Sequence, residues 1–234
     1  MTNPTTPDAA LDGILRRARH LLLDFNGPVC TLYAHQPEHL AADHLRAILA
    51  EHAAEIPENI ATTSDPLTVL AYAAATSPEL AGRAEAELTR YELSAVATAQ
   101  PIASSHDLIS SARESHRTIT VISSCSAQAV RAYLDRASLD EQVGLVIGRK
   151  EQDPDSATEH DLIDRALTAL NADLATCVVV AESQDILDSA SAHSIATIAY
   201  ARSAADDRGP AQAAAAIASL ANLVLRLRAH PLPN

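Results

Sequence analysis

The sequence predicts an α/β protein in which a doubly wound parallel sheet carries an inserted all-helical subdomain. Short, nearly continuous apolar runs alternate with amphipathic helical segments, a pattern that is typical of parallel strands covered by helices on both faces. Residues 33–103 are helical in pattern throughout, and they are too many for a single crossover between neighbouring strands. A chain of 234 residues is long enough to bury a core and to carry this extra unit.

The core elements follow one another in a regular order. Asp8 is expected to cap a first helix, 8–19, and the apolar run 21–25 after it is bounded by Gly27 and Pro28, which predicts a buried strand. Further strands are expected at 118–123, 143–148, 176–181 and 195–200, with 213–217 as a candidate sixth. Helices between and after these strands are expected at 105–115, 126–136, 161–170, 184–192 and 220–228.

The inserted subdomain is predicted from its helix starts. Asp65-Pro66 and Ser77-Pro78 each place a capping side chain before a proline, the residue best tolerated at the first helical position. Helices are expected at 37–54, 67–75 and 78–99, with a break at 56–59. The expected division of the chain is a core of residues 14–32 plus 104–230 and a helical subdomain of residues 33–103.

Composition and charge limit the expected partners. The net charge of −13 makes nucleic acid and anionic membranes unfavourable partners. The N-terminal residues lack the basic and apolar regions of a signal peptide, and no apolar run approaches the roughly 18 residues of a membrane span, so a soluble cytoplasmic protein is expected. Cys30, Cys125 and Cys177 match neither a disulfide framework nor a zinc site, so buried, unreactive thiols are favoured, and the ten histidines show no metal-site spacing.

Several of the predicted strands end in small polar or acidic residues. Asp24 lies at the end of the first strand, and Ser123 ends the next strand of the core. Glu182 and Asp185 follow the strand expected at 176–181. Because sites in open α/β sheets lie at the carboxyl ends of the strands, these residues are candidates for one functional site.

The order of these elements and motifs resembles the haloacid dehalogenase superfamily. The resemblance covers residues 20–228 and rests on LLLDFNG, which contains Asp24, on TVISS, which contains Ser123, and on VVVAESQDILD at 178–188. It implies a Rossmann-like core, a mobile helical cap formed by residues 33–103, a magnesium ion and, in most members, phosphatase activity on small phosphorylated metabolites. It further implies that Asp24 is the nucleophile, that Ser123 binds phosphoryl oxygens, and that Asp24, Glu182 and Asp185 hold Mg²⁺.

Phosphoryl transfer explains why such residue types are needed. A carboxylate held in line can attack phosphorus and form an aspartyl-phosphate, which divides one difficult step into two. Mg²⁺ prefers carboxylates and phosphate oxygens as ligands, and it neutralises charge that would oppose the attack. A hydroxyl and a lysine bind the equatorial oxygens of the phosphoryl group.

The sequence departs from this pattern in ways that predict weak or lost phosphatase turnover. Asn26 stands where the resemblance implies an acid/base Asp, and an amide cannot exchange a proton near neutral pH. The implied lysine would fall near Ala157 or Thr158, and Lys150, the only lysine and the candidate substitute, lies earlier in the chain.

The acidic cluster departs from the pattern as well. Glu182 is one methylene longer than Asp, and Asp185 lies one residue short of the usual spacing. Each candidate also has a structural interpretation: Asp24 as a strand-end cap, Ser123 as a turn residue, Glu182 and Asp185 as an acidic helix start, and Lys150 as a surface lysine.

Two hypotheses of different class therefore remain open. In the first, the chain is a hydrolase that acts on a small phosphorylated metabolite through Asp24. In the second, it is a non-catalytic or repurposed relative that keeps the fold and uses the cleft or the cap for binding. A 2-haloacid dehalogenase is a third, weaker alternative, because that branch also lacks the second Asp of the first motif but depends on the lysine.

Overall fold

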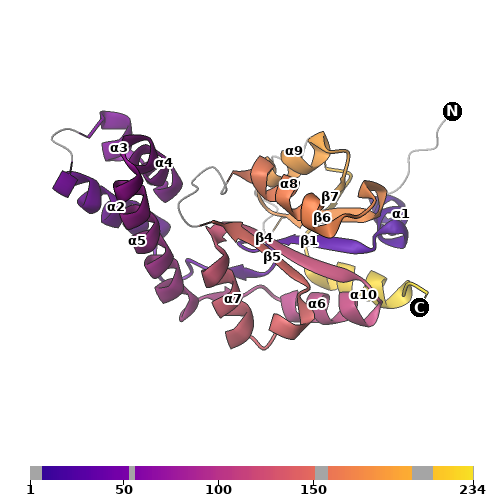
Figure 1. The fold of residues 1–234 in the computed structure, drawn as a ribbon. Helices are drawn as coiled ribbons and strands as arrows, with labels where there is room; N and C mark the ends of the chain where they lie inside the picture. Colours follow the sequence, from indigo (N-terminus) through magenta and orange to yellow (C-terminus); the bar gives the residue numbers. More distant parts are fainter. Residues whose placement is uncertain (1–6, 53–55, 151–157, 202–212, 234) are drawn as a thin grey trace.

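A six-stranded parallel sheet forms the centre of the protein in the computed structural model (Figure 1). The structure describes residues 7–52, 56–150, 158–201 and 213–233. Strand order in the sheet is β5-β4-β1-β6-β7-β8, so the predicted doubly wound parallel fold is confirmed. The strands are β1 (His20–Asp24), β4 (Thr118–Ser126), β5 (Leu145–Arg149), β6 (Cys177–Ala181), β7 (Ala196–Tyr200) and β8 (Ala215–Ile217).

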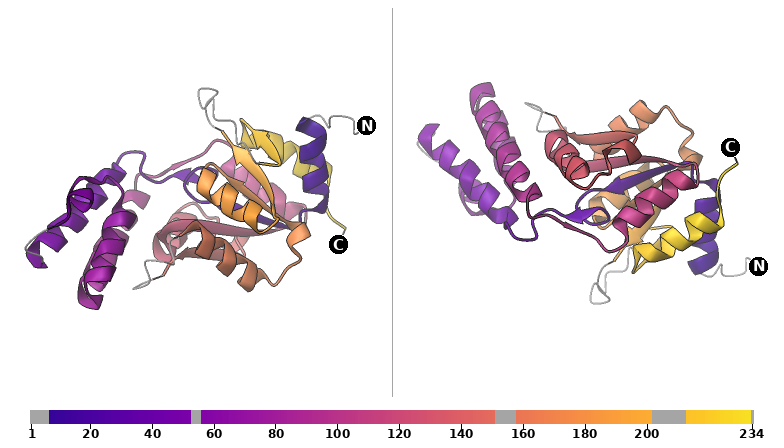
Figure 2. Two further views of the ribbon diagram at one scale, coloured as in Figure 1. Left: turned by 90° about the horizontal axis from the view of Figure 1, so that it is seen from above. Right: turned by 90° about the horizontal axis from the view of Figure 1, so that it is seen from below.

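Helices cover both faces of this sheet. One face packs against α1, α6, α7 and α10, and the other packs against α8 and α9 (Figures 1 and 2). No helix in the described ranges combines the length and the apolar composition needed to cross a bilayer. The helices are α1 (Pro7–Arg17), α6 (Ser105–Glu114), α7 (Ala127–Arg136), α8 (Glu159–Leu170), α9 (Gln184–Ala192) and α10 (Leu220–Ala229).

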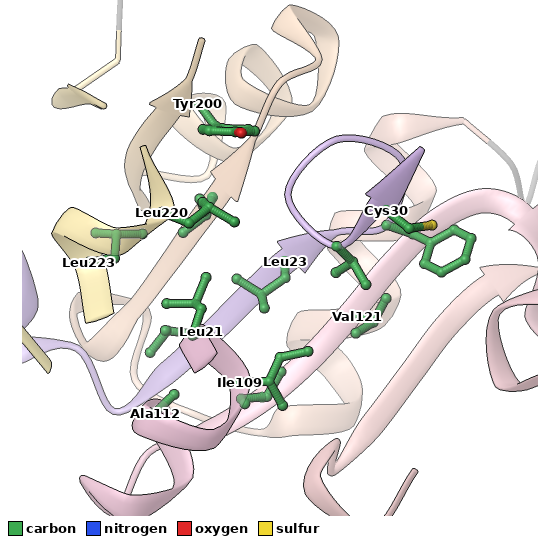
Figure 3. Packing of buried hydrophobic residues seen from close by; sticks show 14 of the residues in the cluster. Leu21, Leu23, Cys30, Ile109, Ala112, Val121, Tyr200, Leu220 and Leu223 are labelled. Carbon is green, nitrogen blue, oxygen red and sulfur yellow. The ribbon is translucent and has the colours of Figure 1, made fainter. Parts of the chain in front are cut away.

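The central strand β1 shows why its leucine run is needed. Successive side chains of a strand point to opposite faces, so Leu21 and Leu23 enter one core and Leu22 enters the other. Figure 3 shows Leu21 and Leu23 packed among Ile109, Val121 and residues of α10. All three leucines are at most 1% exposed, and each such burial contributes about 1.5–3 kcal/mol.

Residues between the first two core strands form a helical insertion with its own apolar core. Figures 1 and 2 show this insertion to one side of the sheet. Asp65 and Ser77 act as N-caps, as predicted, since their side chains accept hydrogen bonds from backbone N–H groups of α4 and α5. The insertion comprises α2 (Glu38–His52), α3 (Glu58–Thr62), α4 (Pro66–Thr76) and α5 (Pro78–Val96).

Two short features of the insertion were not predicted. The expected break contains α3, a single turn in which the Pro57 carbonyl accepts from the N–H groups of Ile60 and Ala61. The two segments that connect the insertion with the sheet form an antiparallel pair, β2 (Cys30–Thr31) with β3 (Gln100–Pro101). Strands of two residues have no measurable alternation of apolar side chains, so periodicity could not reveal them.

Candidate active site at the carboxyl ends of the strands

Asp24 is the last residue of β1, the strand at which the order of the sheet reverses. The chain proceeds from β1 to β4 and β5 on one side and then crosses to β6 on the other side. Helices after β4 and β6 cover opposite faces, so the carboxyl end of β1 is the switch point at which open α/β sheets usually bind their ligands. Asp24 is only 5% exposed, so this carboxyl group is buried at the switch point of the sheet.

The loop after Asp24 is a tight turn fixed by backbone hydrogen bonds. Cys30 N donates to Phe25 O at 3.0 Å, and Gly27 N donates to Cys30 O at 2.9 Å. Gly27 has a φ of +140°, a conformation that side chains with a Cβ rarely adopt. Phe25 N donates to Ile122 O at 2.9 Å, so this turn is also tied to the end of β4.

Asn26 is exposed on this turn, and its amide stabilises the loop. Its Oδ1 accepts from Leu32 N at 3.2 Å, which holds the chain as it leaves the turn toward the helical insertion. The amide has no proton that titrates near neutral pH, so Asn26 supplies a hydrogen-bond acceptor and no acid/base group.

Ser123 lies beside Asp24 on the neighbouring strand β4, three residues before that strand ends. In the sheet register Asp24 is opposite Ile122, and Ser123 is the next residue of β4. Ser123 is 2% exposed, and its Oγ accepts from Cys125 N at 3.0 Å within an irregular stretch of the strand. Because the hydroxyl accepts in this bond, its O–H group can donate to a third partner such as a phosphoryl oxygen.

Glu182 follows β6, the strand on the other side of β1, and its carboxylate lies against the turn after Asp24. A Cβ at Gly27 would be 2.9 Å from Glu182 Cβ and 3.1 Å from Glu182 Oε2. The missing side chain at position 27 therefore leaves the space in which the Glu182 carboxylate lies. Asp185 is exposed in the first turn of α9, which Ser183 caps by accepting from Ile186 N.

Lys150 lies farther from Asp24 than these residues. It is exposed and follows Arg149 at the end of β5, and β4 separates β5 from β1. A cavity of about 400 Å³ is lined by Lys150 together with Arg131, Arg165 and the start of α7. Of the two positions at which the resemblance places a lysine, 157 lies outside the described residues and Thr158 is the exposed N-cap of α8.

Arg149 forms a buried ionic network with the helical insertion, which the sequence analysis did not anticipate. Its Nε donates to Glu85 Oε2 at 2.8 Å and its Nη1 to Glu92 Oε1 at 2.8 Å, and both glutamates belong to α5. Nη1 also donates to Ser124 O at 2.8 Å, and Glu92 Oε2 accepts from Ser126 N at 2.9 Å. The network therefore joins α5 to the last residues of β4 and to the positive end of α7.

The electrostatics of this network favour a charged arginine. Burial by itself would lower the pKa of Arg149, but the carboxylates of Glu92 and Glu85 outweigh it and hold the pKa above its ordinary value. One feature of the sequence could have indicated this network. Glu85 and Glu92 are seven residues apart, which places both on the face of α5 that carries the buried Leu88.

The cysteines near the site are buried free thiols, as favoured from the sequence. Burial raises the pKa of the Cys30 thiol, opposed by the charge of Arg136 and reinforced by that of Asp24. Burial likewise raises the pKa of Cys125, with a further contribution from Glu92. Neither thiol is a nucleophile at neutral pH, because the thiolate is the reactive form.

Comparison with known proteins identifies the fold. No family model matches the chain, and no curated protein matches it. Among solved structures, a haloacid dehalogenase-type phosphatase from Thermococcus onnurineus is 16% identical and aligns over 92% of this chain and all of its own, with a TM-score of 0.60. CbbY from Rhodobacter sphaeroides, in complex with phosphate, is 16% identical over 88% of this chain and 99% of its own, with a TM-score of 0.62.

A protein described as a dehalogenase is also similar, at 14% identity over 88% of this chain and 95% of its own, with a TM-score of 0.56. These identities are low, so the likeness concerns the fold. The chain thus has the fold of haloacid dehalogenase-like phosphatases and dehalogenases, as its motifs predicted.

Proposed function

We propose that this chain is a haloacid dehalogenase-like hydrolase that binds a small phosphorylated metabolite and transfers its phosphoryl group slowly to Asp24. One observation carries the proposal. The buried Asp24 carboxylate lies at the switch point of the sheet, with Ser123 beside it on β4 and Glu182 directly after β6, the two flanking strands. The phosphate bound to CbbY, a protein of the same fold, is consistent with a phosphorylated ligand.

Asp24 and Ser123 perform the first step. An Oδ atom of Asp24 attacks phosphorus, the bond from phosphorus to the leaving oxygen breaks, and an aspartyl-phosphate forms. The Ser123 O–H group donates to an equatorial phosphoryl oxygen, where negative charge is concentrated. Burial of Asp24 limits the access of water to the carboxylate, and a fixed position of the nucleophile favours in-line attack.

Asp24, Glu182 and Asp185 are the residues proposed to hold a magnesium ion; among the described residues only His160, Asp164 and His193 bring three ligand atoms within 4.8 Å of one another, so these carboxylates would have to move together to bind it. Asp24, Glu182 and Asp185 offer only oxygen atoms, the donor type that Mg²⁺ prefers, and the space at Gly27 admits the longer Glu182 side chain. When bound, Mg²⁺ would neutralise charge between the phosphoryl group and Asp24. The helices α2–α5 are proposed as the cap over this edge, with residues 14–32 plus 104–230 as the core and residues 33–103 as the cap.

Asn26 explains why turnover is proposed to be slow. A carboxylic acid at this position would protonate the leaving group and would later activate water against the aspartyl-phosphate. Loss of such a group typically lowers the rate by about 10²–10⁴-fold. Leaving groups that depart without a proton, such as p-nitrophenolate, should therefore be the better substrates.

Phosphate release from a panel of aryl and alkyl phosphate esters, with and without Mg²⁺, tests this function. We expect slow, Mg²⁺-dependent release that favours aryl esters and that disappears in Asp24→Asn. Asn26→Asp should raise the rate most for alkyl esters. If neither the native chain nor Asn26→Asp releases phosphate from any ester, the hydrolase proposal is wrong.

A binding protein without turnover is the second candidate, and the buried ionic network favours it. Arg149, Glu85 and Glu92 fix α5 to the ends of β4 and β5, which opposes the cap opening that a fast hydrolase requires. Saturable binding of a phosphorylated sugar without phosphate release would support this candidate. Release of halide from 2-haloacids in the same panel would instead support the dehalogenase alternative.

A further inference from the structure

Two histidines and an aspartate form a cluster on α8 and α9, outside the candidate active site. His160 and Asp164 lie one turn apart on α8, and His193 is the C-cap residue of α9. None of the three lies at the carboxyl end of a strand. The first two side chains are exposed and the third is half-buried, so the cluster is accessible from solvent.

The three side chains converge on one point. His193 Nε2 is 2.7 Å from Asp164 Oδ1, and His160 Nε2 is 3.4 Å from Asp164 Oδ2. The imidazole rings are 5.1 Å apart between centroids, and one ligand atom from each residue lies within 4.8 Å of the others. Ligands about 2.0–2.1 Å from a tetrahedral metal are separated by roughly 3.4 Å, so small side-chain movements would complete a site.

His193 is oriented as metal-binding histidines usually are. Its Nδ1 lies 2.8 Å from the backbone carbonyl oxygen of Ser189. A carbonyl oxygen only accepts, so Nδ1 carries a hydrogen, and Nε2 donates to the Asp164 carboxylate at 2.7 Å; a metal ion would take the place of this second proton between Nε2 and Asp164. Ligating histidines almost always donate their second ring N–H to a carbonyl or carboxylate in this way.

We propose that His160, Asp164 and His193 bind a divalent transition metal of the zinc class, which links α8 to α9. Two imidazole nitrogens with one carboxylate suit Zn²⁺, Co²⁺ or Ni²⁺ and are poor ligands for Mg²⁺, so this site differs from the proposed magnesium site in chemistry as well as in place. Three protein ligands leave a further coordination position to water. The histidines show no metal-site spacing along the sequence because the third ligand comes from a separate helix.

Isothermal titration of the full chain with Zn²⁺, after chelator treatment and in excess Mg²⁺ to saturate the oxygen site, tests the proposal. We expect one equivalent to bind, with the affinity reduced roughly tenfold or more in His160→Ala and in His193→Ala. Asp164→Asn should weaken binding as well. Zn²⁺ should also raise the melting temperature of the native chain, and not that of the variants, because a ligand that binds only the folded state stabilises it.

His44→Ala is the matched control, because His44 forms an exposed pair with Glu87 at 2.9 Å but belongs to no three-residue cluster among the described residues. Its zinc affinity should equal that of the native chain. Absence of zinc binding, or equal affinity in the native chain and in both His160→Ala and His193→Ala, would mean that the cluster is only an ion pair. Co²⁺ bound to the native chain should give visible absorption bands that His193→Ala lacks.

Discussion

At the scale of single residues, the site keeps the groups that bind and attack a phosphoryl group and lacks the group that moves protons. Asp24 is buried at the end of β1, and Ser123 follows the residue that is opposite Asp24 in the register. Asn26 is engaged with Leu32 N as a structural acceptor. The identity of all three residues was predictable from the sequence, whereas the bond that occupies Asn26 depends on the geometry of the turn.

Tyr133 carries a buried hydroxyl that finds no hydrogen-bond partner within the described residues. Its ring packs edge-on against Phe25 at 5.4 Å between centroids, so Tyr133→Phe should keep this contact. A buried polar group without a partner costs about 1–3 kcal/mol, and we expect the variant to be at least as stable as the native chain in urea unfolding. A loss of more than about 1 kcal/mol would reveal a partner for the hydroxyl.

Tyr133→Phe should also change how the stability of the protein depends on alkaline pH. Burial raises the pKa of Tyr133 to about 12, with a smaller rise from Cys30 and an opposing effect of Arg136. The unfolded chain ionises near the ordinary value of about 10, so the contribution of this residue to stability is full below that pH and is lost as the pH rises toward 12. Tyr133→Phe should lack this contribution, so its free energy of unfolding should fall less between pH 9 and 12 than that of the native chain, as measured by urea unfolding.

Gly148 allows β5 to approach the start of α7. A Cβ at this position would lie 2.5 Å from Ala127 N and 2.9 Å from Cys125 O, and backbone atoms cannot move aside cheaply. We expect Gly148→Ala to lower the free energy of unfolding by about 1–3 kcal/mol. Gly82→Ala is the control, since nothing lies within 4 Å of its added Cβ and alanine favours the helix by about 0.5–1 kcal/mol.

At the scale of elements, the long helices and strands were predictable and the contacts between them were not. Every predicted strand is present, most of them as buried runs of β-branched or leucine residues, and every α-helix of the described residues except α3 was anticipated within a few positions. The pair β2–β3 and the turn α3 are too short to be predicted from the spacing of apolar residues. Arg149 with Glu85 and Glu92 joins segments that are more than fifty positions apart, and no local pattern encodes such a pairing.

The effects of substituting Arg149, Glu85 and Glu92 on the stability of the protein should depend strongly on one another. Arg149→Met leaves two carboxylates buried without a cation, and the loss of one partner from such a network costs about 3–5 kcal/mol. Adding Glu85→Gln and Glu92→Gln removes the uncompensated charge and should restore most of that loss. Urea unfolding of the single and triple variants measures the difference, and equal stability of the two would show that the network is not coupled.

At the scale of the whole molecule, one sheet supports a proposed site for phosphoryl transfer at its carboxyl edge and a proposed transition-metal site on the helices of one face. Figure 2 shows the helical insertion to one side of the sheet, and α5 is tied by Glu92 and Glu85 to the ends of β4 and β5. The fold class was predictable because the strands and the helices that cover them each have a distinct pattern of apolar residues. The polar contacts between these layers, such as Arg149 with Glu85, were not predictable because they depend on how the layers pack.

The rate at which the three cysteines are labelled should measure the unfolding of the whole molecule. All three are buried free thiols, two in one core and one in the other, and burial raises the pKa of each. We therefore expect a thiol reagent at pH 8 to label the native chain only at the rate of unfolding, and to label all three cysteines at once in denaturant. Labelling of one cysteine at a rate that denaturant does not change would reveal local opening instead.

The central claim is that Asp24 accepts a phosphoryl group and that Asn26 makes its release slow. Intact-mass measurement after brief incubation with p-nitrophenyl phosphate and Mg²⁺, quenched in acid, tests this claim most directly. The native chain should carry one added phosphoryl group at Asp24, Asn26→Asp should carry less because its carboxylate activates water for the second step, and Asp24→Asn should carry none. An unmodified native chain, or an equal adduct on Asp24→Asn, would contradict the claim.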